Sequence, residues 1–386
     1  MSDPRAIPFG RPSITEEDRA AVAAVLDTPI LTHGPQCRAF EEEFAAFLGP
    51  GAHCVTVSSC MAALHLACLR VGFGPGDDVL VPAQTHAATA HAVEWVGARP
   101  VFADCDPCTG NVTADTLARA LTPRTRGIVL VHFVGIPCEM GDIVGFAHRR
   151  GLPVVEDCAL AVGSRWRGTH VGLLGDAGCF SFYPVKHMTT GEGGMFVSRD
   201  AETASAVARL RAFGVERSGS AASIPGAYDV PSLGLNYRMG EMQAALGRSQ
   251  LLRVPAMLEA RRARFERLCA ALQGLPGVRV LDSASPDCAS SHYCLSLVLG
   301  RALARSRDDI VRSLNAHGIG TSVYYPHPVP RLDYYRNRYA LDPEAYREAA
   351  RLSDASIALP VAPHVSLEGI DRIADAVSEA VKEVQV

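Results

Sequence analysis

The sequence predicts an α/β fold: a large domain over residues 1–250 with a mostly parallel mixed sheet between helices, and a smaller α+β C-terminal domain over residues 251–386. Three observations predict it. The chain has 386 residues, 48% of them hydrophobic, which is enough for one large and one smaller core. Over the first two-thirds, apolar strand-like runs alternate with helix-like runs, as in a parallel sheet covered on both faces. Near residue 240 this alternation gives way to a long helical stretch.

The elements of the large domain follow from hydrophobic periodicity and turn signals. A helix is expected over residues 16–26, with Ser13 and Glu16 at the spacing of a capping box. Further helices are expected over residues 38–48, 60–71 and 86–97. The expected strands are the short apolar runs at residues 54–57, 78–82, 99–104, 126–133, 152–157, 177–183 and 193–198.

The second unit begins after a helical stretch over residues 240–275 that Pro255 interrupts. Beyond it, strands are expected over residues 294–300 and 321–326, and a C-terminal helix over residues 370–384. This mixture of elements predicts an α+β unit.

Composition and charge exclude several classes of protein. A net charge of −4 gives no electrostatic reason to expect nucleic-acid binding. No apolar run is long enough to span a bilayer, and the first residues lack the pattern of a secretory signal, so a cytoplasmic protein without membrane association is expected. Cys105 and Cys108 form a CxxC pair, but no second ligand pair accompanies them, so no metal site is expected.

Four segments carry polar residues suited to an active site. An apolar strand ends at Asp157, and ligands of open parallel sheets bind outside the carboxyl ends of the strands. Lys186 lies in an apolar loop, where burial would lower its pKa and make the amine a nucleophile toward aldehydes. Ser59 precedes a helix whose first amides can bind a phosphate. Asn236 and Arg238 precede another helix and could reach an anionic group.

Taken singly, each feature has a simpler interpretation, such as a helix cap or a surface lysine. Together they resemble the DegT/DnrJ/EryC1/StrS family of sugar aminotransferases, which have the aspartate-aminotransferase fold. The resemblance covers nearly the whole chain, and its most specific parts are FSFYPVKHMTTGEGGM and LGLNYRMGEMQAALG. It implies pyridoxal 5'-phosphate as cofactor and transfer of an amino group from glutamate or glutamine to a keto-sugar. The TTGEGGM loop is most similar to enzymes that aminate nucleotide-linked 4-keto-6-deoxysugars, while C3-aminating enzymes and other keto-sugars remain open.

The resemblance also implies roles for single residues. Lys186 is expected to bind the cofactor covalently and to shuttle a proton. Asp157 is expected to keep the pyridine nitrogen protonated, so that the ring acts as an electron sink. The other expected cofactor contacts are a ring-stacking His86, phosphate contacts from Ser59, Cys60, Met61 and Ser181, and Asn236 from the second subunit of a homodimer with shared active sites. The expected substrate-binding residues are His33, Arg238, Tyr324 and Tyr325.

Three departures from the family pattern leave alternatives open. Cys60 and Met61 stand where the family has Gly-Thr, Leu160 stands where it has Gln or His, and Tyr324 stands where it has His. One alternative is a non-catalytic regulator or binding protein that keeps the fold. Another is a sugar dehydratase of the same family, in which histidine replaces the lysine. Because Lys186 is present, aminotransfer is the favoured prediction.

Overall fold

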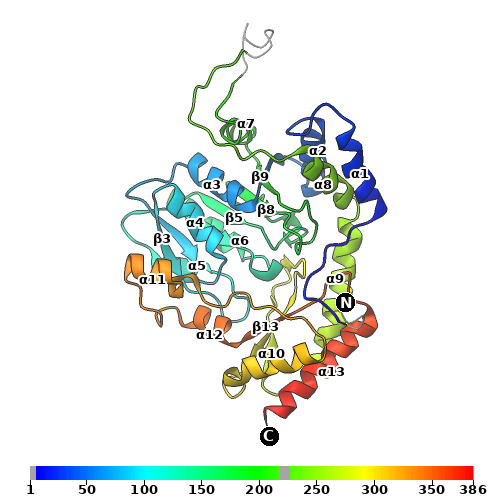
Figure 1. Ribbon diagram of the computed structural model, residues 1–386. Helices are drawn as coiled ribbons and strands as arrows, with labels where there is room; N and C mark the ends of the chain where they lie inside the picture. Colours follow the sequence, from blue (N-terminus) through cyan, green and yellow to red (C-terminus); the bar gives the residue numbers. More distant parts are fainter. Residues whose placement is uncertain (1–5, 217–226, 386) are drawn as a thin grey trace.

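The computed structural model describes residues 6–216 and 227–385. Its centre is one large sheet (Figure 1) of β1 (His53–Val57), β2 (Asp78–Pro82), β3 (Arg99–Ala103), β4 (Thr125–Val131), β5 (Val154–Asp157), β8 (Ala177–Ser181) and β9 (Gly194–Ser198). The strand order is β1-β9-β8-β5-β4-β2-β3. The pairs from β8 to β3 are all parallel, whereas β9 runs antiparallel to both β1 and β8. The predicted mostly parallel mixed sheet is therefore confirmed.

Helices cover both faces of this sheet because successive strand residues point to opposite sides. Val79 and Val81 pack with α3 (Cys60–Arg70), α4 (Ala87–Trp95) and α7 (Ala201–Leu210). Leu80 between them packs on the other face, with α5 (Ala114–Ala120) and α6 (Met140–His148). That face also carries α2 (Pro35–Leu48) and α8 (Glu241–Leu251), with α1 (Glu16–Leu26) against α8. Among the helices described, none is long and apolar enough to cross a membrane.

The C-terminal part has its own antiparallel sheet of β10 (Val278–Val280), β12 (Leu295–Leu299) and β13 (Ser356–Leu359). Its helices are α9 (Val254–Leu272), α10 (Arg307–Ala316), α11 (Asp333–Tyr339), α12 (Arg347–Ala355) and α13 (Leu367–Glu383). A small sheet of β6 (Arg165–Trp166), β7 (Thr169–His170) and β11 (Cys288–Ala289) links the two parts. The N-terminal Ile7 also bridges to Ile319 in the C-terminal part. The domain boundary at residue 250 stays a prediction.

Two local predictions were wrong. The capping box is formed by Thr15 and Asp18, not by Ser13 and Glu16, because Thr15 is the residue that directly precedes the first helical turn. The expected strand over residues 321–326 is absent: Ser322 makes one isolated bridge, and the chain then turns toward the large sheet. The helical stretch over residues 240–275 is two helices, and Pro255 lies in the first turn of α9, where its missing N–H costs nothing.

The Cys105–Cys108 turn fastens the two parts of the chain together. Cys105 is buried and Cys108 is exposed. Asp104, just before the turn, accepts hydrogen bonds from the backbone N–H groups of Glu348 and Ala349 at the start of α12. The segment therefore has a structural role as a cap on a C-terminal helix.

Candidate active site

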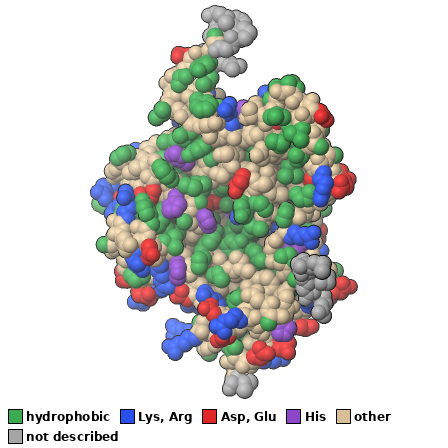
Figure 2. All heavy atoms as spheres, in the orientation of Figure 1, with side chains coloured by type: hydrophobic (Ala, Val, Ile, Leu, Met, Phe, Trp, Pro, Cys, Tyr) green, Lys and Arg blue, Asp and Glu red, His purple; other side chains and the backbone are tan. Residues whose placement is uncertain are grey.

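A cavity of about 380 Å³ lies at the carboxyl ends of the parallel strands, where open α/β sheets bind ligands. In the orientation of Figure 1, hydrophobic side chains gather in the central region of the molecular surface, with histidines along one side (Figure 2). The structure brings together in this cavity the predicted residues Ser59, Cys60, Met61, His86, Asp157, Ser181, Lys186, Tyr324 and Tyr325. Residues that are up to 266 positions apart in the sequence, from Ser59 to Tyr325, thus share one site.

Asp157 is the last residue of β5 and is 3% exposed. Its Oδ1 accepts a hydrogen bond from the backbone N–H of Ala159 at 3.0 Å, and its Oδ2 accepts one from the Thr89 hydroxyl at 2.7 Å. Each oxygen keeps lone pairs for a further donor. The carboxylate is therefore held in one orientation at the wall of the cavity.

Lys186 follows β8 in a tight turn, in which its backbone N–H donates to the carbonyl of Tyr183. Its Nζ lies 5.4 Å from the centre of the Tyr293 ring. Among the described residues, Lys186 takes part in no ion pair. Burial lowers the pKa of Lys186, and the Asp157 carboxylate partly opposes that shift. A lysine that loses its proton more readily is a better nucleophile, as the sequence predicted.

The start of α3 faces the same cavity. Ser59 is the N-cap residue, and its hydroxyl accepts a hydrogen bond from the backbone N–H of Ala62 at 3.1 Å. Gly194 at the start of β9 lies so close that a Cβ there would come within 2.6 Å of the backbone N of Cys60. With Ser181 at the end of β8, this region offers hydroxyls and helix-end amides to an anion.

Aromatic side chains line the rest of the cavity. His86 caps α4, and its Nδ1 accepts a hydrogen bond from the backbone N–H of Ala88, so the ring proton lies on Nε2. Its ring meets that of Tyr325 edge-on, with centroids 5.6 Å apart. The hydroxyl of Tyr324 is 2.7 Å from that of Tyr293.

Three predicted residues do not line the cavity of this chain. Asn236 bridges to Ala212, and its Oδ1 accepts a hydrogen bond from Arg238 Nε at 3.0 Å. The Arg238 guanidinium lies 5.0 Å from the centre of the Phe213 ring. His33 Nε2 accepts a hydrogen bond from Arg211, and burial together with the Arg211 charge lowers the pKa of His33 to about 4. In the single chain His33 is thus a neutral partner of an arginine.

The sequence interpretation missed several residues of the site. Thr89 holds Asp157, Tyr293 faces Lys186, and Glu192 lines the cavity. Gln84, fully buried, donates from its side chain to the carbonyl of Tyr324 at 3.0 Å and so fixes the Tyr324 segment to the large sheet. Thr89 had a usable signal: it follows His86 by three residues, which places both on one face of the expected helix.

The departures from the family pattern lie in the cavity wall. Cys60 is buried, and its Sγ is 3.4 Å from the carbonyl oxygen of Cys179 and 3.9 Å from Asp157 Oδ1. Burial and the Asp157 charge raise the pKa of the Cys60 thiol, which keeps it protonated. Leu160 is 1% exposed and also lines the cavity. Both positions are therefore packed, neutral parts of the wall.

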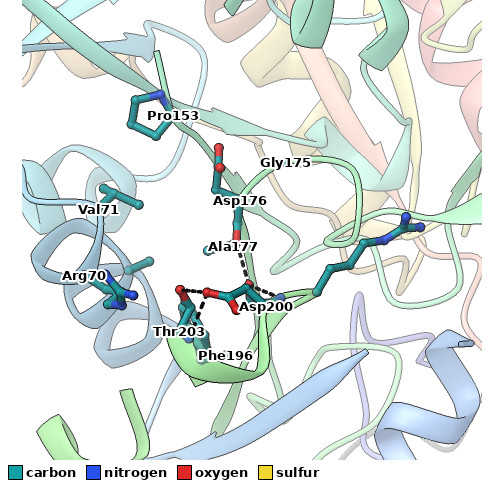
Figure 3. A pocket seen from close by; sticks show the side chains of 12 residues that line it. Arg70, Val71, Pro153, Gly175, Asp176, Ala177, Phe196, Asp200 and Thr203 are labelled. Atoms are coloured by element: carbon teal, nitrogen blue, oxygen red, sulfur yellow. Dashed lines mark hydrogen bonds between the residues drawn. The ribbon is translucent and has the colours of Figure 1, made fainter. Parts of the chain in front are cut away.

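A second cavity, of about 420 Å³, lies at the amino ends of β5 and β8, opposite to the strand ends that face the first cavity. Figure 3 shows the side chains that line it. Asp200 caps α7 there and accepts hydrogen bonds from Thr203, on the side that faces Arg70. Asp176 accepts one from the backbone N–H of Val154. None of the predicted site residues lines this cavity, and these two carboxylates are engaged in holding their own segments.

Comparisons with known proteins agree with the site. The model of the DegT/DnrJ/EryC1/StrS aminotransferase family matches residues 12–378. The chain is 35% identical over 380 residues to the spore coat polysaccharide biosynthesis protein SpsC of Bacillus subtilis (strain 168), covering 97% of each chain. It is similar to the PLP form of the sugar aminotransferase Spr1654 from Streptococcus pneumoniae, with a TM-score of 0.91, 28% identity and coverage of 98% and 99%. It is also similar to DesI in the presence of its TDP-sugar product, with a TM-score of 0.87, 30% identity and coverage of 99% and 95%.

The family match spans nearly the whole chain, and the cavity holds the lysine and the aspartate that the resemblance requires. The chain belongs to the DegT/DnrJ/EryC1/StrS aminotransferase family and is a sugar aminotransferase that depends on pyridoxal 5'-phosphate.

Proposed function

We propose that this enzyme transfers an amino group from glutamate or glutamine to a nucleotide-linked 4-keto-6-deoxysugar. One observation carries the proposal: Lys186 and Asp157 line a single cavity together with Ser181 and the start of α3. The similarity to DesI, whose structure contains a TDP-sugar product, supports a nucleotide-linked substrate. The likeness of the TTGEGGM loop to C4-aminating enzymes supports the position of the keto group.

The residues of the cavity fit pyridoxal phosphate. The Ser59 and Ser181 hydroxyls and the first backbone amides of α3 can bind its phosphate group. The buried Asp157 carboxylate can accept a hydrogen bond from the protonated ring nitrogen. The Lys186 amine can react with the aldehyde group. When bound, the cofactor supplies an electron sink that stabilises negative charge at the carbon undergoing amino transfer.

The remaining steps fall to side chains of this chain. We assign to Lys186 the removal and return of a proton at the reacting carbon, because its pKa is lowered by burial. We assign to His86 the contact with the cofactor ring, because its imidazole lines the cavity at the start of α4. Tyr324 and Tyr325, which enter from the C-terminal part, are proposed to contact the sugar.

We further propose a homodimer in which Asn236 completes the site of the partner subunit, with His33 and Arg238 on the substrate side. Asn236 and Arg238 lie outside the cavity of their own chain. The segment around them exposes large apolar side chains, namely Phe213, Tyr228, Val230 and Leu233, the last of which is 94% exposed. Burying them against a second copy would remove this apolar surface from water. A cytoplasmic location is part of the same proposal, and cell fractionation tests it.

The sequence offers a sharp test of the lysine assignment because it contains two lysines, Lys186 and Lys382. Lys382 is exposed in the last turn of α13. Borohydride treatment of the cofactor-loaded protein, followed by peptide mapping, should place the reduced cofactor on Lys186. Lys382→Arg is the matched control and should keep both colour and labelling, whereas label on Lys382 alone would refute the assignment.

The substrate class is tested with a panel of nucleotide-linked keto-sugars and with glutamate or glutamine as donor. Mass spectrometry should detect an amino sugar formed in step with the keto acid from the donor. The 4-keto-6-deoxysugars should give the highest kcat/KM. If wild type and Lys382→Arg bind the cofactor and aminate other keto-sugars of the panel but not the 4-keto-6-deoxysugars, the proposed substrate class is wrong.

A further inference from the structure

We propose that Thr89 and Thr85 are positioning residues that hold the Asp157 carboxylate through a chain of two hydroxyl groups. The inference rests on the proposed role of Asp157 toward the cofactor. It concerns two residues that lie behind the cavity wall, since neither is among the residues that line the cavity.

This chain of two hydroxyl groups is short and wholly buried. The Thr89 hydroxyl is 2.7 Å from Asp157 Oδ2, and the Thr85 hydroxyl is 2.7 Å from that of Thr89. Thr85 is 1% exposed, Thr89 0% and Asp157 3%. At such burial a lost hydrogen-bond partner is not replaced by bulk water, so each link has an energetic consequence.

The direction of donation follows from chemistry. An ionised carboxylate only accepts hydrogen bonds, so the single hydroxyl proton of Thr89 points to Asp157. Thr89 can then only accept from Thr85, which must be the donor of the second link. Both hydroxyl dipoles are thereby aligned toward the negative charge of Asp157, and a chain of this kind strengthens each of its members.

The two threonines belong to the start of the helix that also supplies His86 to the cavity wall. Thr85 precedes α4, His86 is its N-cap residue, and Thr89 lies in its first turn. One helix start thus presents the His86 ring to the cavity and the Thr89 hydroxyl to the carboxylate behind it. The Ala159 N–H on Oδ1 and the Thr89 hydroxyl on Oδ2 together fix the plane of the Asp157 carboxylate. That plane sets the direction from which a donor in the cavity can reach the carboxylate.

The test is a set of variants loaded with pyridoxal 5'-phosphate. Thr89→Val keeps the shape of the side chain, removes the donor to Asp157 and leaves the Thr85 hydroxyl without its acceptor. We expect it to weaken cofactor binding by up to roughly 10-fold, the low end of the range for loss of a hydrogen bond to a charged group, because Thr89 holds Asp157 both with and without the cofactor. We also expect it to raise the pH at which the visible absorption of the bound cofactor changes, in the same direction as Asp157→Asn. Thr89→Ser should restore both values, and Thr85→Val should give a smaller shift.

Thermal unfolding of the cofactor-free variants separates positioning from folding. Thr116→Val is the matched control, because Thr116 is buried and hydrogen-bonded in the capping box of α5, away from the cavity. It should lower the unfolding temperature without moving the absorption change. If Asp157→Asn moves the absorption change and Thr89→Val does not, or if Thr89→Ser shifts it as far as valine, this inference is refuted while the role of Asp157 stands. If Asp157→Asn has no effect either, the assignment of Asp157 is refuted as well.

Discussion

A mixed dimer can show whether each active site is built from two chains. Lys186 lines the cavity of its own chain, whereas Asn236 lies outside it, held by Arg238 at 3.0 Å. If the partner subunit supplies Asn236, then Lys186→Ala and Asn236→Ala should each be badly impaired as homodimers. In a mixed dimer one site contains both substitutions, and the other combines an intact Lys186 with an intact Asn236.

The expected recovery of activity follows from the number of intact sites in each kind of dimer. Random pairing of equal amounts makes about half of the dimers mixed, and each mixed dimer has one intact site of two. Co-refolding should therefore restore about a quarter of wild-type activity per chain, and mixed dimers isolated with two affinity tags should reach about a half. The assay is the rate of keto-acid formation from the amino donor with a keto-sugar that wild type accepts.

The control mixture pairs Asn236→Ala with Lys382→Arg, whose lysine is exposed and remote from the cavity. Whether the sites are shared or built from a single chain, this mixture should recover about half of the wild-type activity per chain, so a lower value reports losses in refolding alone. Mixed Lys186→Ala and Asn236→Ala dimers that are no more active than the sum of the two parents would refute the shared site.

Three further predictions follow from the electrostatics and the caps. Because burial lowers the pKa of Lys186, borohydride-trapped uptake of pyridoxal phosphate by the cofactor-free protein should have its midpoint below the ordinary lysine value of about 10.4; a midpoint at that value would contradict it. Buried Glu156 accepts hydrogen bonds from His132 Nε2 and three backbone N–H groups, which lower its pKa although burial alone would raise it, so Glu156→Gln should cost about 3 kcal/mol at pH 7 in urea unfolding. A lowered pKa means that this stability is present above the unfolded value of about 4.3 and is lost as the pH falls, so wild type and variant should converge in acid; a constant gap would refute the linkage. Asp104→Ala removes the cap of α12 and should lower the free energy of unfolding by about 1 kcal/mol, with kcat/KM as a check that the site is intact.

Much of the fold could be predicted from local sequence patterns. The strands β2 and β4 contain uninterrupted apolar runs, at residues 79–81 and 128–131, because both faces of the parallel sheet are buried, and such runs are visible without a structure. Asp157 and Ser181 could be expected at one edge because both end parallel strands. The segment over residues 321–326 has the composition of a strand, but its pairing with β13 ends after the single bridge between Ser322 and Ala358. The carbonyl of Tyr324 then accepts a hydrogen bond from Gln84, and such tertiary contacts override local strand propensity.

The sequence by itself determined the fold class, the family and the positions of Lys186 and Asp157, because strand ends, loop motifs and apolar periodicity are local properties of the chain. Only the tertiary structure decided which side chains surround these two. Thr89 meets Asp157 across 68 positions, and Lys186 faces Tyr293 across 107. These contacts arise from the packing of α4 and of the C-terminal part against the sheet edge. A short hydrogen bond or ring contact depends on distances of a few ångströms, and no pattern of residue types along the chain specifies such distances.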